Sequence, residues 1–277
     1  MRLKLSLSVA ASLLALSFTS PADEVATKGR EIFTKQQHAV VTVQLVQKVT
    51  YSASGRAGQS QEIKQDLTGT VLDPSGLTVM ALSSVDPTEM SRRMYGDQVK
   101  VEVEVSDLKI LLDDGAEIPS EIVLRDKDLD LAFIRPKAKP ASPMAAVDFA
   151  KTAKVDVLDQ VITLNRLGRA AGRAYAASVE HISAVVQKPR TFYIPDSAMT
   201  ATSSGSPAFA LDGNLVGVFV MRALSAGGGG NARQDNVTSI ILPAEDVLKA
   251  AKQAPEAKGE ESKQEPAKET KAEPEKK

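Results

Sequence analysis

The feature that most constrains this chain is a succession of short apolar runs, many of them rich in Val and Ile, separated by turn signals. Runs of this length with β-branched residues predict strands rather than helices. The segments between them, such as Asp113-Asp114-Gly115 and Asp212-Gly213-Asn214, are typical of tight turns between neighbouring strands. The chain is therefore predicted to be all-β, folded as a sandwich or as barrels.

The predicted strands follow a short helical stretch near residues 24–37 and begin with the run from His38 to Ser52. The later strands are expected in LTGTVLD (67–73), LTVMAL (77–82), QVKVEVEVS (98–106), LKILLDD (108–114), EIVLRD (121–126), LAFIRP (131–136), DQVITLN (159–165), AASVEHISAVV (176–186), NLVGVFVMR (214–222) and VTSIILP (237–243).

A Pro- and Ala-rich segment at residues 135–153 divides these strands into two groups of similar size. Two small barrels joined there fit the pattern, with the first at about residues 36–138 and the second at about 153–254. Residues 243–254 carry acidic side chains early and lysines late, which predicts a C-terminal helix. Residues 255–277 mix Lys, Glu and Pro with little apolar surface, which predicts a disordered tail.

The N-terminus predicts export. Arg2 and Lys4 precede an apolar run from about Leu5 to Phe18, and the small-residue site Ser20-Pro21-Ala22 follows. This arrangement is typical of a secretory signal peptide, residues 1–22, cut near Asp23. The run is shorter than the roughly 20 residues that span a bilayer, which makes an uncleaved anchor the second interpretation. We expect localisation to the periplasm or the extracellular space, with no membrane span after cleavage.

Composition narrows the chemistry further. The chain has no cysteine, which excludes disulfides, thiol catalysis and Cys-ligated metal sites. Lys and Arg total 34 against 35 Asp and Glu, so the balance does not suggest a nucleic-acid partner. Acidic pairs such as Asp113-Asp114 lie in turns without metal-ligand partners, so neither a metal nor a cofactor is expected.

Two segments resemble the trypsin-like serine proteases, specifically the bacterial HtrA (Deg) type. SSGSPAFALDGNLVGVFV resembles the family's G-[ND]-S-G-G-[AP] turn and following strand, which puts Ser204 on the nucleophile. RDKDLDLAFIRP resembles the D-x-x-x-D-[LI]-A-[LV]-[IL] segment, which puts Asp130 on the triad aspartate. The resemblance implies two six-stranded Greek-key barrels. The residues after Ser204 are taken up by strands, one helix and the tail, so the PDZ domain common in HtrA proteins is not expected.

A third segment, TGTVLDPSGLTVMALSSVD, is similar to the family's S-G-[FV]-[IV]-[IV]-D-x-x-G-x-[IV]-[LV]-T-N-x-H-V-V stretch, and it places Ser83 where the histidine should be. A serine nucleophile needs that imidazole to accept its proton and to deliver it to the leaving amine. The alternatives are weaker. His38 opens the first strand, His181 lies in a later one, and no lysine adjoins Ser204 or Ser83 for a Ser-Lys arrangement.

The oxyanion hole is expected to be impaired as well. The resemblance puts its two amides at Thr202 and Ser204, and family enzymes have glycine where this chain has Thr202. A β-branched residue tolerates unusual backbone angles poorly, and one oxyanion donor is worth about 10²–10³ in rate.

These observations predict an inactive pseudoprotease that binds peptides or proteins in the cleft between the barrels. The strand that pairs with substrate in the family corresponds here to Val218, Phe219, Val220 and Met221. Two other functions stay open, an active serine endopeptidase with an unconventional base and a structural envelope protein. The sequence leaves the oligomeric state open.

Overall fold

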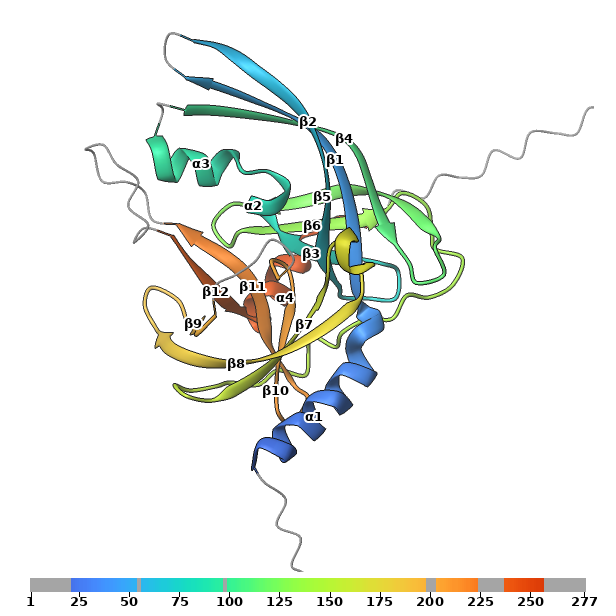
Figure 1. The fold of residues 1–277 in the computed structure, drawn as a ribbon, viewed down its shortest axis with the longest axis vertical. Coiled ribbons are helices and arrows are strands. Elements are labelled where there is room, and N and C mark those ends of the chain that lie inside the picture. The colour runs from blue at the N-terminus through green and yellow to red at the C-terminus, as the bar shows by residue number, and fades with distance from the viewer. Residues whose placement is uncertain (1–20, 54–55, 97–98, 198–202, 224–236, 257–277) are drawn as a thin grey trace, which may run out of the picture.

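Two closed barrels, each of six antiparallel strands, make up the computed structural model (Figure 1). The structure describes residues 21–53, 56–96, 99–197, 203–223 and 237–256. In the first barrel the strand order is β1-β2-β3-β6-β5-β4. Its strands are β1 (Val40–Ala53), β2 (Arg56–Val71), β3 (Thr78–Ala81), β4 (Val99–Leu111), β5 (Glu117–Asp126) and β6 (Leu131–Pro136).

The second barrel has the order β10-β11-β12-β9-β8-β7. Its strands are β7 (Gln160–Arg166), β8 (Tyr175–Val186), β9 (Phe192–Pro195), β10 (Pro207–Ala210), β11 (Leu215–Ala223) and β12 (Val237–Pro243). A C-terminal helix, α4 (Ala244–Ala251), follows β12 directly and has Glu245 in its first turn and Lys249 in its last, which complements the helix dipole. The two barrels and this helix confirm the expected fold class.

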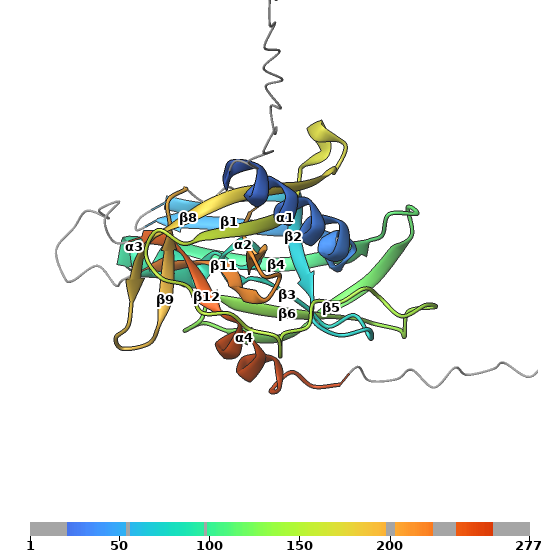
Figure 2. The same ribbon diagram turned by 90° about the horizontal axis from the view of Figure 1, so that it is seen from below.

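The other helices lie at the ends and junctions of the barrels. They are α1 (Pro21–Gln36), η1 (Gln37–Ala39), α2 (Leu82–Val85), α3 (Thr88–Tyr95) and η3 (Arg169–Ala171). Helix α1 packs on the second barrel, where Gly29 lets the helix approach Ile162, and α4 lies on the opposite side (Figure 2). None of the helices in the described ranges has both the length and the apolar character needed to cross a membrane.

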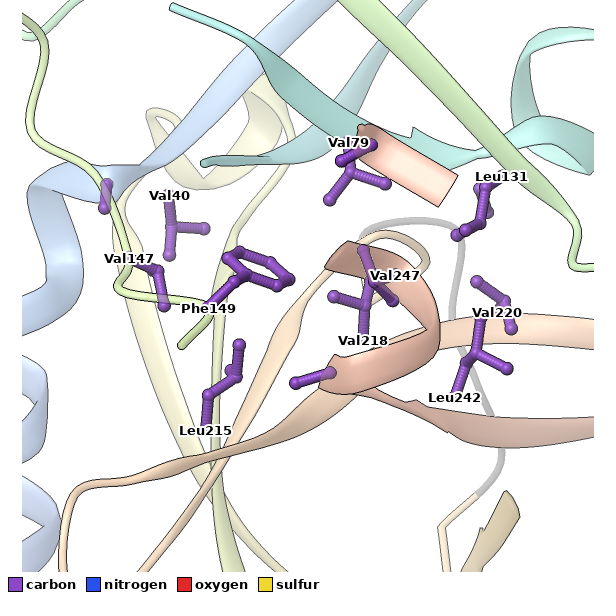
Figure 3. Close-up of a cluster of buried hydrophobic side chains, with 14 of the residues drawn as sticks. Val40, Val79, Leu131, Val147, Phe149, Leu215, Val218, Val220, Leu242 and Val247 are labelled. Carbon is purple, nitrogen blue, oxygen red and sulfur yellow. The ribbon is translucent and has the colours of Figure 1, made fainter. Parts of the chain in front are cut away.

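An apolar core fills the space between the two barrels (Figure 3). Val79 and Leu131 enter it from the first barrel, Val218 and Val220 enter it from β11, and Val247 closes it from α4. Successive side chains on a strand point to opposite faces, so Val218 and Val220 share one face of β11. Phe219, between the two valines, points the other way and packs in the interior of the second barrel. The inter-barrel core fixes how the two barrels meet, and therefore how residues from each can form one site.

Two strand predictions need correction. The runs at 98–106 and 108–114 were expected to be separate strands, yet both lie mainly in the single strand β4. Ser106 is a bulge, since Val46 and Gln47 of β1 pair with Asp107 and Val105 and skip it. The bulge moves the apolar residues from odd to even positions, which made one strand look like two.

Strand β2 also begins 11 residues before the expected run at Leu67, at Arg56. The first half of β2 is polar and, among the described strands, pairs only with β1. Its sequence therefore lacks the alternation of apolar residues that predicts a strand. Helix α3 and strand β9 were not predicted either. Most of the expected signal peptide and tail lies outside the described residues. The carbonyl of Pro255, where the tail was expected to begin, accepts a hydrogen bond from Arg135 Nε at 3.0 Å.

Candidate active site

Asp130 is the centre of the candidate site and lies in the turn before β6 with a left-handed φ of 58°. One carboxylate oxygen accepts the backbone N–H of Ser83 at 2.7 Å. The other accepts the Ser83 hydroxyl at 2.9 Å and the backbone N–H of Met221 at 2.8 Å. Burial raises the pKa of Asp130 to about 6, although these three hydrogen bonds act in the opposite direction. The side chain thus joins the first barrel to β11 of the second.

Ser83 owes its place to the short helix α2, which follows β3 at once. The backbone N–H of Leu82 donates to the main-chain carbonyl of Asp130 at 2.8 Å, so the start of α2 is held against the Asp130 turn. Both the amide and the hydroxyl of the next residue, Ser83, then reach the carboxylate. The structure therefore brings Ser83 and Asp130 into direct contact.

Ser204 sits in the tight turn that precedes β10. The turn requires Gly205, whose φ is +88° and whose absent Cβ would lie 2.5 Å from the carbonyl oxygen of Thr68. Thr70 donates its hydroxyl to the Gly205 carbonyl at 2.8 Å, and the Gly205 amide donates to the carbonyl of Phe219 at 2.8 Å. These contacts fix the turn against both barrels, and they leave Ser204 only 3% exposed.

Ser84 is the site residue that the sequence analysis missed. Its hydroxyl donates to the Ser204 hydroxyl at 2.8 Å across the barrel interface. Ser83 and Ser84 are neighbours on α2. The Ser83 hydroxyl donates to Asp130, and the Ser84 hydroxyl donates to Ser204. The only signal available in the sequence was the pair of adjacent hydroxyls at the position where the family motif has a histidine.

Both histidines have partners elsewhere. His38 precedes β1, and its Nδ1 lies 2.9 Å from Asp113 Oδ2 and 3.3 Å from the Tyr175 hydroxyl. His181 lies on β8, with Nε2 at 3.1 Å from Gln160 Nε2.

The Nδ1 of His181 lies 3.2 Å from Asp196 Oδ2. Among the described residues, neither a histidine nor a lysine makes a hydrogen bond to Ser204. In the same ranges, no three His, Cys, Asp or Glu side chains form a group that could hold a metal ion.

Thr202, one of the two expected oxyanion-hole positions, lies outside the described residues, so its backbone conformation remains a prediction. The expected substrate strand is better defined. Val218 and Val220 are fully buried in the inter-barrel core, and Phe219 is 2% exposed in the second barrel. The side chains of these three residues face protein, so a ligand can use only the main chain of this strand or the half-buried Met221.

Beyond Phe219, one edge of β11 carries main-chain groups that no described strand pairs, and Ala223 at its end is 4% exposed. Phe219 donates its N–H to the carbonyl of Ser206 at 2.9 Å, and Met221 donates its N–H to Asp130, so odd-numbered residues present their backbone groups to this edge. The Met221 carbonyl and the Ala223 N–H face the same way. Within the described part of the chain, no strand pairs with β11 on this side past Val218.

Arg93 of α3 occupies the carbonyl of Ala223, the acceptor at the end of this edge. Its guanidinium donates to the carbonyl of Ala223 at 3.3 Å and to the carbonyl of Lys127 at 3.1 Å. Glu89 lies 3.4 Å from Arg93 Nε, one helical turn away, and supports its orientation. Helix α3 therefore links the first barrel to β11 beside the candidate site.

A pocket opens next to Asp130, where the two barrels meet. The first barrel and its connections contribute Ser83, Asp86, Glu89 and Lys127, and the second contributes Arg190, Phe192 and Arg222. Its enclosed space is small, enough for a group of the size of one or two water molecules, such as a carboxylate. Met221 also lines it, so the pocket lies directly beside the open edge of β11.

Comparisons with known proteins agree with this geometry. Residues 67–218, more than half of the chain, match the family model of the trypsin-like peptidase domain. A protein of Arabidopsis thaliana described as "Putative protease Do-like 14" is 27% identical over 180 residues, which is 62% of this chain and 39% of that protein. The chain therefore spans about two fifths of the length of this relative.

Proposed function

This chain belongs to the family of trypsin-like peptidase domains and is of the HtrA (Deg) type, and from this membership we propose that it is a catalytically inactive member that binds extended peptide segments between its barrels. The observation that carries the proposal is the hydrogen bond from Ser84 to a Ser204 hydroxyl that is 3% exposed. An attacking serine must be reachable and must have a proton acceptor. Ser204 has a neighbouring hydroxyl instead.

The chemistry of a hydroxyl explains why Ser84 does not replace an imidazole. A serine hydroxyl can share a hydrogen bond, but it cannot accept and hold a proton near neutral pH as an imidazole can. Asp130 does not serve Ser204 directly, since its described hydrogen bonds are to Ser83 and Met221. In serine proteases with this triad, loss of the histidine alone can cost about as much turnover as loss of all three residues. We therefore expect no measurable proteolysis.

Peptide binding needs no base. A peptide in extended conformation can add a strand to a sheet edge through main-chain hydrogen bonds, and neighbouring pockets then select side chains. The Met221 carbonyl and the Ala223 N–H offer one acceptor and one donor for this pairing. The signal-peptide pattern at residues 1–22 supports a place for this activity in the periplasm or outside the cell.

Labelling with a fluorescent fluorophosphonate tests the proposed inactivity. The chain from residue 23 onward should remain unlabelled and should leave unfolded casein intact, with Ser204→Ala as the matched control. Ser83→His alone should also stay unlabelled, because Ser84 still holds the Ser204 hydroxyl. Labelling of the wild type that disappears in Ser204→Ala would instead establish a serine hydrolase with an unconventional base.

A backbone variant tests the proposed binding edge. Ala223→Pro removes the N–H of Ala223, whereas Ala223→Ser keeps it. Capture of peptides from a tryptic digest of casein on the immobilised chain should fall in the proline variant and persist in the serine variant. Equal capture by both variants, or none by the wild type, would contradict binding at β11 and favour the structural envelope role.

A further inference from the structure

The pocket beside β11 has uncompensated positive charge on one of its walls. Arg190, from the β8–β9 connection, and Arg222, from β11, both line it. Among the described residues neither guanidinium has an ion pair or a hydrogen bond, and the described contact of Arg222 is with the ring of Phe192, 4.9 Å from the ring centroid. A stacked guanidinium is held in place while its N–H groups remain available to a ligand.

The acidic side chains of the same pocket are already committed on the opposite wall. Glu89 pairs with Arg92 and Arg93. Asp130 accepts its three hydrogen bonds from groups other than the two arginines of the pocket.

Two further carboxylates lie near the mouth of the pocket. Asp86 accepts the N–H of Thr88 at 3.1 Å, and Asp128 lies 4.0 Å from Arg93 on the exposed side. Each acidic residue thus has a partner on the first barrel's side. On the second barrel's side, Arg190 and Arg222 have no ion pair among the described residues, and on the first barrel's side Lys127 has none either.

The two arginines lie beside the unpaired edge of β11, and this position determines which part of a bound peptide they can contact. Arg222 lies between Met221 and Ala223, whose main-chain groups form the edge, and all three residues line the pocket. A peptide paired with this edge would therefore place a side chain next to the guanidinium of Arg222. Arginine presents a planar set of donors that matches a carboxylate.

From this placement we propose that the pocket binds the carboxylate of an aspartate or glutamate side chain of the extended peptide, with Arg190 and Arg222 as its ligands. The proposal rests on the proposed function, because it names the class of segment that the same cleft selects. It adds a preference that main-chain pairing alone does not provide.

A positional-scanning library of N-acetylated, C-amidated octapeptides tests the preference, since blocked ends leave side chains as the source of carboxylate. Binding to the wild-type chain should be about tenfold tighter for pools with a fixed Glu or Asp than for the matched Gln or Asn pools. A second arm with free C-termini distinguishes a terminal carboxylate. If only those peptides bind tightly, the side-chain assignment is wrong.

Variants locate the preference. Arg190→Gln and Arg222→Gln should each lose most of the Glu-over-Gln ratio and keep binding of the Gln pools, whereas Arg125→Gln, which removes an exposed arginine from β5, should keep the ratio. Arg222→Lys should retain part of it, because it keeps the charge. Thermal melts of all variants establish that they are folded.

The remaining outcomes separate the two proposals. Equal binding of the Glu and Gln pools to the wild type, or enrichment of Lys pools, would overturn the acidic preference and leave peptide binding intact. Failure of every pool to bind would overturn the proposed function itself.

Discussion

The buried carboxyl group of Asp130 should make the folded state less stable as the pH rises. Burial raises its pKa from an ordinary 3.8 to about 6 in the folded chain. Between these values the folded state holds a proton that the unfolded state has lost, so the folded state binds more protons and stability falls with increasing pH. Below 3.8 both states are protonated, and above 6 the full cost of ionising the buried group is present.

The magnitude follows from the two pKa values of Asp130. Their difference corresponds to about 3 kcal/mol over the whole range, of which about 2 kcal/mol should appear between pH 4 and pH 8. Other carboxylates act in the opposite sense. The pKa values of Asp66 and Asp113 are lowered by nearby arginine, histidine or tyrosine groups, so they add stability that is lost as the pH falls. A reference without Asp130 is therefore needed.

Urea unfolding of the wild type and Asp130→Asn from pH 4 to pH 8 isolates the effect. The amide cannot accept all three hydrogen bonds, which costs a roughly constant 1–3 kcal/mol, so only the change of the difference with pH is informative. The free energy of unfolding of the wild type, minus that of the variant, should fall by about 2 kcal/mol across the range. A difference that stays flat or rises would show that Asp130 is ionised without cost, and the reasoning from burial would fail.

Two further substitutions test the packing around the site. Ser206→Ala should raise the free energy of unfolding by about 1 kcal/mol, because the buried Ser206 hydroxyl has no hydrogen-bond partner among the described residues; urea unfolding measures it, and a comparable decrease would reveal a partner. Gly217→Ala should lower stability by about 3 kcal/mol or more, because a Cβ there would lie 1.9 Å from the Leu242 carbonyl oxygen. In thermal melts the control is Gly168→Ala, which meets nothing within 4 Å, and equal melting temperatures would contradict the packing.

The barrels were predictable because their strands carry apolar runs that must be buried, and the turns between them carry Gly, Asp and Pro. The apolar pattern failed to predict strands correctly where their side chains are exposed or where a bulge shifts the buried face. The first half of β2 is polar and held by β1 alone, and the Ser106 bulge changes which residues of β4 face inward. Helix α3 left a weaker trace, namely Glu89 and Arg93 at helical spacing and Gly96 as its stop.

The candidate site was predictable only in part for a related reason. The residue order before β6 and before β10 was enough to single out Asp130 and Ser204, since each lies in a turn with a recognisable motif. Ser84 and Ser204 are 120 residues apart, and their hydrogen bond depends on how the barrels dock. The same holds for Arg190 and Arg222, which come to one pocket from the β8–β9 connection and from β11. Local sequence carries no signal for such pairs.

The pair of serines on α2 has a consequence for how this domain can change over time. Two adjacent hydroxyls divide between them the two hydrogen bonds that one imidazole would make, since Ser83 bonds Asp130 and Ser84 bonds Ser204. Among the described residues, Asp130 and Ser204 therefore both have the partner that a histidine could supply. A histidine that arises at Ser83 meets a Ser204 already engaged by Ser84, and removal of Ser84 alone leaves a buried hydroxyl unpaired. Neither single substitution is expected to give proteolytic activity or to improve the hydrogen bonding of the site. Under the proposed function, a return to proteolysis therefore requires changes at both Ser83 and Ser84, in addition to any change that the oxyanion hole needs at Thr202.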